Sequence, residues 1–137
     1  MGMEMHELVY PVCRNSEESI NHLFLNCTWA EKCWKLTREW LKTQIPAVSS
    51  IEDLFVWVYM DRGKEMRRRI LEVIICSVLN TIWTHRNKVV FKKQELSTEI
   101  ATLKIKEEVF SWIDSRARKI QIDRSLWATY PFDACKV

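Results

Sequence analysis

Three residues near the start of the chain have side chains that could hold a metal ion together, namely Cys13, His22 and Cys27. They follow the spacing Cys-x8-His-x4-Cys, and cysteine thiolates with histidine are the usual ligands of structural zinc. Because such sites are four-coordinate, one position stays open, which His6, Cys33 or water could fill. The other interpretation is that the cysteines pack as small hydrophobic side chains in a core. Zinc is therefore a candidate cofactor, and no other cofactor is indicated.

The residues around these three candidate ligands resemble a known family. Residues 10–13 read Tyr-Pro-Val-Cys, residues 17–27 read Glu-Glu-Ser-Ile-Asn-His-Leu-Phe-Leu-Asn-Cys, and Trp34 follows. This stretch is similar to the zinc-binding domain of plant non-LTR retrotransposon reverse transcriptases. That family has a Cys-Pro-x-Cys pair, an acidic spacer with serine, His-Leu-Phe-x-x-Cys and a later tryptophan. Tyr10 stands where the family has its first cysteine, so the resemblance implies a degenerate site.

A second segment extends the resemblance to about residues 8–91, and more weakly through the last helix. Residues 82–91 read Ile-Trp-Thr-His-Arg-Asn-Lys-Val-Val-Phe, similar to the family's downstream helix with its tryptophan, Arg-Asn pair and phenylalanine. The resemblance implies a retroelement-derived module, with zinc-dependent RNA or DNA binding as one function. Because the flanking reverse transcriptase and ribonuclease H domains are not in this sequence, it also implies a detached piece.

The chain has no motif that indicates catalysis. There is no nucleophile elbow, P-loop, dinucleotide fingerprint or paired-carboxylate motif, and no His-Glu-x-x-His accompanies the metal candidates. We therefore expect a protein that is not an enzyme.

Two basic clusters are candidates for contact with nucleic acid. The first is Arg67, Arg68 and Arg69, and the second is Arg86, Lys88 and Lys92 beside Trp83. A cation next to an aromatic ring suits nucleic acid, although cations also stabilise the C-terminus of a helix as a solvated surface. The net charge of only +3 is a weak electrostatic footprint, so nucleic-acid binding is the alternative rather than the leading hypothesis.

The elements that must position these residues are predicted to be helices. Two glycines and three prolines are few breakers, and β-rich folds need many turns. We predict one all-α domain over residues 1–137, an irregular bundle of about five helices. A zinc-knuckle-like segment over 1–45 precedes a helical core over 50–121 and an aromatic tail over 122–137. The helices are expected over 19–26, from Thr28 with a Thr28–Glu31 capping box, over 51–60, over about 64–91, and from Ser97 to about Gln121.

Apolar side chains give the leading functional hypothesis. Seven tryptophans are many for this length, and the last helix carries a second apolar stripe beyond the one that packing requires. We expect Trp34, Trp83 and Cys76 in the core and His85 at the surface or at an interface. The expected function is a non-catalytic module acting by protein–protein interaction, with self-association included. Its predicted interface is Ile105, Val109, Trp112 and Trp127.

The chain is expected to be intracellular, in cytoplasm or nucleus. It shows no basic segment followed by an apolar run at its start, and no uncharged apolar stretch of about 18 residues, so neither a secretory signal nor a membrane span is predicted. Five cysteines without a secretory signal indicate a reducing compartment.

Overall fold

The computed structural model describes residues 19–61, 63, 65–116 and 122–135, and within these ranges the chain is helical, without a strand. The all-α prediction is therefore confirmed, whereas residues 1–18 of the zinc-knuckle-like segment lie outside the described residues. The elements are a single π-helical turn η2 (His22–Asn26), α1 (Thr28–Leu41), α2 (Ile51–Tyr59), α3 (Glu65–Lys92), α4 (Thr98–Arg116), α5 (Arg124–Trp127) and α6 (Pro131–Ala134).

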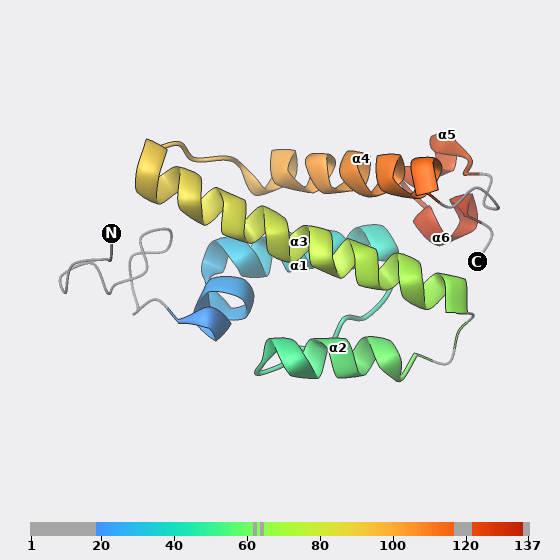
Figure 1. Cartoon of the computed structure of the whole chain (residues 1–137), viewed down its shortest axis with the longest axis horizontal. Helices are drawn as coiled ribbons and strands as arrows, with labels where there is room; N and C mark the ends of the chain where they lie inside the picture. Colours follow the sequence, from blue (N-terminus) through green and yellow to red (C-terminus); the bar gives the residue numbers. More distant parts are fainter. Residues whose placement is uncertain (1–18, 62, 64, 117–121, 136–137) are drawn as a thin grey trace.

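The long helix α3 is the centre of the bundle. Figure 1 shows α4, α3 and α2 lying side by side, with α1 on the far side of α3 and the short α5 and α6 at one end. A hydrogen bond of 3.3 Å from the Ser77 hydroxyl to Glu108 fixes the antiparallel register of α3 against α4. None of the described helices has the length and apolar character needed to cross a bilayer.

Burial along α3 agrees with the central position predicted for it and corrects the position expected for Trp83. The buried side chains of α3 are Ile70, Leu71, Ile74, Ile75, Val78, Ile82, His85, Arg86 and Val89. Trp83 was expected in the core but is 46% exposed, whereas His85, expected at the surface or at an interface, is only 3% exposed. Trp83 lies on the outer side of the helix, whereas His85 faces α1, whose Trp29 covers it.

Side-chain caps fix where two of the helices begin. Ser50 accepts a hydrogen bond from the Asp53 amide at 3.2 Å, just before the helix predicted from residue 51, and Ser97 accepts one from the Ile100 amide at 3.2 Å, where the last long helix was predicted to begin. The predicted Thr28 capping box does not form. Thr28 is the first residue of α1 and not its N-cap. The N-cap is Cys27, whose side chain forms no capping hydrogen bond.

The C-terminal tail is held against α1 and α4 by tryptophan. The Trp40 indole N–H donates to the Trp127 carbonyl at 2.8 Å, and the Trp127 indole N–H donates to the Lys106 carbonyl at 2.7 Å. The two rings meet edge to face with centroids 5.2 Å apart, a favoured aromatic geometry. The tail therefore closes one end of the core.

Candidate interaction surface

The candidate zinc ligands are only partly within the described residues. Cys13 lies outside them, His22 is half-buried in η2, and Cys27 is fully buried at the N-cap of α1. Among the described residues no three His, Cys, Asp or Glu side chains are grouped closely enough to hold a metal ion.

Cys33, one candidate for the open position, is a buried thiol. Burial, with smaller contributions from the neighbouring Glu99 and Cys27, raises the pKa of its thiol to about 12. A zinc ligand must be a thiolate, which this surrounding disfavours in the absence of a metal ion. Cys13 and His6 lie outside the described residues, so the zinc site stays a prediction.

Within the first basic cluster, Arg67 is used inside the fold and Arg69 is exposed. Arg67 donates to the Asp61 carboxylate at 2.8 Å, and its guanidinium lies 4.4 Å from the centre of the Phe132 ring. Arg69 forms an exposed ion pair with Glu65 at 3.1 Å. Arg67 is therefore committed to packing the tail and the loop before α3.

The second basic cluster lies at the opposite end of α3. Arg86 is buried, and its guanidinium is 5.3 Å from the centre of the Trp83 ring, so it is not presented as a surface cation. Twenty helical residues separate Arg68 from Lys88, which at 1.5 Å per residue is about 30 Å. The two clusters do not form one basic face.

Three of the four residues predicted for a protein interface belong to the core of the monomer. Ile105, Val109 and Trp127 are fully buried, because α4 contacts both α3 and α1 and its second apolar stripe is covered by a neighbour. The interface prediction is therefore corrected at these positions. Trp112, at 39% exposure, is the one that reaches the surface.

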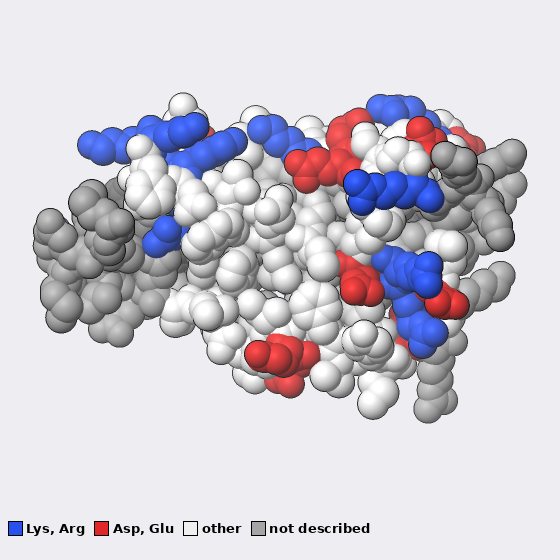
Figure 2. All heavy atoms as spheres, in the orientation of Figure 1, with Lys and Arg blue, Asp and Glu red and all other residues white. Residues whose placement is uncertain are grey.

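Trp112 stands at the edge of a hollow of about 530 Å³ between α3 and α4. A second hollow of about 350 Å³ lies between α2 and α3, where Tyr59 is 77% exposed. Arg69 and Glu72 of α3 line both hollows, so the two flank one ridge of α3. We call this surface the α2–α3–α4 face. Its hollows are lined by charged as well as apolar residues, among them Arg69, Glu72 and Glu108, and Figure 2 shows basic and acidic side chains close together toward the right of this side of the molecule.

The sequence prediction missed Cys76, which lies on this face. It was expected in the core, but it is exposed and lines the hollow between α3 and α4. Partial burial, followed by the charge of Glu72, raises the pKa of its thiol. The spacing of Glu72, Cys76 and Asn80 by four residues would have placed all three on one polar side of the helix.

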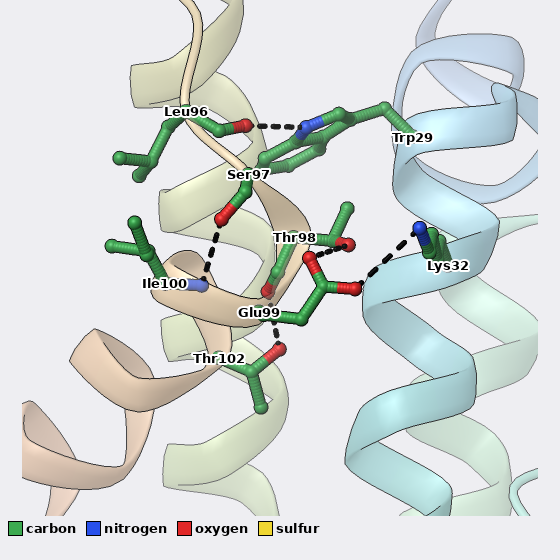
Figure 3. Close-up of polar contacts among 8 residues, drawn as sticks. All are labelled: Trp29, Lys32, Leu96, Ser97, Thr98, Glu99, Ile100 and Thr102. Atoms are coloured by element: carbon green, nitrogen blue, oxygen red, sulfur yellow. Dashed lines mark hydrogen bonds and ion pairs between the residues drawn. The ribbon is translucent and has the colours of Figure 1, made fainter.

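A second feature lies where the N-terminal ends of α1 and α4 meet (Figure 3). The Trp29 indole N–H donates to the Leu96 carbonyl at 2.9 Å, and Lys32 pairs with Glu99 at 3.5 Å. The Trp29 ring also stacks on His85, with centroids 3.8 Å apart. Neither ring nitrogen of His85 has a hydrogen-bond partner in the described part of the chain. Burial lowers the pKa of His85, which keeps the imidazole neutral at pH 7.

Comparison of the chain with models of protein families, with characterised proteins and with solved structures finds no match.

Proposed function

We propose that this protein is a non-catalytic helical module that acts by protein–protein contact through the α2–α3–α4 face, with a second copy of itself as the partner. The observation that carries the proposal is the pair of hollows flanking one ridge of α3, with an exposed aromatic residue on each side. Tyrosine, tryptophan and arginine are the residue types that contribute most to binding energy in protein interfaces. Tyr59, Trp112 and Arg69 supply all three types here.

The charges on this face support a second copy as the partner. Arg69 lies in the same hollow as Glu72 and Glu108, so basic and acidic groups sit within one surface. In a two-fold dimer the same surface meets itself, and each Arg69 can pair with an acidic residue of the other copy. The ion pair that Arg69 now makes with Glu65 is exposed, so exchanging it costs little.

Nucleic-acid binding has less support. The two basic clusters predicted to contact nucleic acid lie at opposite ends of α3. The described residues also hold no group of three metal ligands. The resemblance to a retroelement zinc-binding segment is the remaining argument for it, and a retroelement origin stays part of the proposal.

Sedimentation velocity over a series of protein concentrations tests the proposal. We expect a monomer that converts to a dimer as concentration rises, because the face buries aromatic side chains on association. Trp112→Ser and Tyr59→Ser should each weaken the dimer about tenfold or more, as expected for an interface aromatic.

Ile20→Ser is the matched control, since Ile20 is exposed but lies before η2 and off this face. Circular dichroism should show all three variants folded. A wild-type chain that stays monomeric throughout the series, or a dimer that responds equally to the control, contradicts the proposal.

A further inference from the structure

The end of the hairpin formed by α3 and α4 carries several lysines. The side chains of Lys88, Lys92, Lys93 and Lys104 form no ion pair or hydrogen bond within the described residues. Figure 2 shows Lys and Arg gathered over this end of the molecule, at the upper left. We call these four lysines the basic end. Cations that have no partner within the described residues are available to an anionic partner.

Lys93 adds a separate argument because its backbone is strained. Its φ is 52°, in the left-handed region that usually selects glycine after a helix. Lys42, with φ 54°, has the same strain, but its ammonium donates to the Thr129 carbonyl at 3.0 Å and lies over Tyr130. Lys93 has no such contact in the described structure. The Lys93 ammonium therefore stays available for an external contact.

The basic end also exposes large apolar side chains. Phe91 is 75% exposed and Leu103 is 60% exposed, with Ile100 about half exposed. The Ser77–Glu108 hydrogen bond places Ile100 beside His85 across the hairpin. Phe91 is six residues farther along α3, about 9 Å along the helix axis. Apolar and cationic groups therefore alternate over one end of the molecule.

The acidic residues of this region face elsewhere. Glu95 and Glu99 line a hollow of about 380 Å³ together with Trp29 and His85, and Glu99 is paired with Lys32. Neither carboxylate forms an ion pair with Lys88, Lys92, Lys93 or Lys104 within the described residues.

We propose that the basic end binds the surface of an anionic phospholipid bilayer. Lysines are attracted to anionic headgroups, while a few apolar side chains insert at the boundary between headgroups and acyl chains. Insertion buries the aliphatic side chains of Ile100 and Leu103, which is favourable. Binding of single-stranded nucleic acid depends instead on flat rings on which the bases stack. The exposed aliphatic pair therefore favours a lipid surface over single-stranded nucleic acid. This inference goes beyond the proposed self-association and uses different side chains.

Co-sedimentation with vesicles tests the inference. Vesicles of phosphatidylcholine containing about 30% phosphatidylserine should bind the full-length chain, and added salt should weaken the binding. Vesicles of phosphatidylcholine alone should bind it far less. Each change of Lys88, Lys92 or Lys104 to Gln should lower the partition coefficient about fivefold, since one basic residue contributes about that much. Phe91→Ser should lower it about tenfold.

Lys93 provides a pair of variants that separates charge from folding. Lys93→Arg should keep binding, whereas Lys93→Gly, which relieves the backbone strain, should fold at least as well and bind about fivefold less. Lys35→Gln, at an exposed lysine of α1, is the control that should bind like wild type.

The inference is overturned if the folded protein does not bind the phosphatidylserine vesicles, or if it binds both vesicle types equally and without salt dependence. It is also overturned if the lysine variants lose binding to single-stranded RNA while the wild type binds no vesicles, because the basic end is then a nucleic-acid surface. Each outcome is independent of the sedimentation velocity result for the α2–α3–α4 face.

Discussion

The rings of Trp29 and His85 stack face to face, with centroids 3.8 Å apart and planes only 4° from parallel. This contact joins the first turn of α1 to the last third of α3, and the Trp29 indole N–H also holds the Leu96 carbonyl before α4. The Trp29 side chain thus connects α1, α3 and the segment before α4. The imidazole beneath it is buried without a hydrogen-bond partner in the described chain, which is costly for a polar group.

The protein should lose stability in mild acid through His85. Burial lowers the pKa of His85 below its ordinary value of 6.5, an effect to which Lys88 adds and which Glu95 opposes. The unfolded chain therefore binds a proton more readily than the folded chain in the window just below pH 6.5. Stability is complete above that pH and falls as the pH drops toward the lowered pKa.

Urea unfolding between pH 5 and 8 measures this dependence, with His85→Phe as the comparison. The variant keeps a ring under Trp29 but cannot be protonated, so it should be about 1 kcal/mol more stable at pH 7 and should lack this part of the acid loss. Parallel pH profiles for the two proteins would show that His85 does not couple folding to protons.

Relieving the backbone at Lys93 should stabilise the fold. A left-handed conformation costs a non-glycine residue about 1 kcal/mol or more, and Lys93→Gly should recover about 1 kcal/mol. Lys42→Gly should recover less, because it also removes the contacts of Lys42 with Thr129 and Tyr130. Denaturant unfolding of both variants gives the comparison. A destabilised Lys93→Gly protein would show that this lysine has an internal role.

Trp34 and Trp83 were both expected in the core, but their replacement by alanine should lower stability by different amounts. Trp34 is buried and its indole N–H donates to the Phe24 carbonyl at 2.7 Å, so Trp34→Ala should cost about 3–5 kcal/mol. Trp83 is half exposed, and Trp83→Ala should cost about 1 kcal/mol. Thermal unfolding of the matched pair checks the burial assignment. Equal losses in melting temperature would contradict it.

Cysteine reactivity should distinguish the exposed thiol from the buried ones. A maleimide applied to the native protein should modify Cys76 well before Cys33 and Cys135, which are buried with raised thiol pKa values. Because the pKa of Cys76 is also raised, its labelling rate should still increase about tenfold per pH unit near neutrality. Mass spectrometry of peptides identifies the site. Labelling of Cys33 as fast as Cys76 would refute the packing of α1.

Much of the fold could be predicted because its signals are local. The cap at Ser50, the cap at Ser97 and the run without breakers before Lys92 each depend on residues within one element. The orientation of α3 could not be predicted in the same way. Its apolar residues extend around most of the helix, so periodicity alone does not decide whether Trp83 or His85 faces inward.

The candidate surface depended even more on distant contacts. Ile105 and Val109 form an apolar stripe in either arrangement, and only the packing of α4 against both α3 and α1 buries it. The burial of Trp127 could not be predicted either, because its position depends on the hydrogen bond from its indole N–H to the distant Lys106 carbonyl. Whether a hydrophobic side chain is exposed depends on how the helices pack against one another, and the periodicity of a single sequence does not reveal that packing.

Cross-linking through Cys76 tests the central claim most directly. Cys76 lines the hollow between α3 and α4, so two copies that meet on the α2–α3–α4 face bring their Cys76 thiols close together. In a Cys13→Ser background, a short bismaleimide should produce a covalent dimer that Cys76→Ser abolishes and Trp112→Ser reduces. If a single-headed maleimide modifies Cys76 completely while the bismaleimide yields only monomer at high protein concentration, the claim is contradicted.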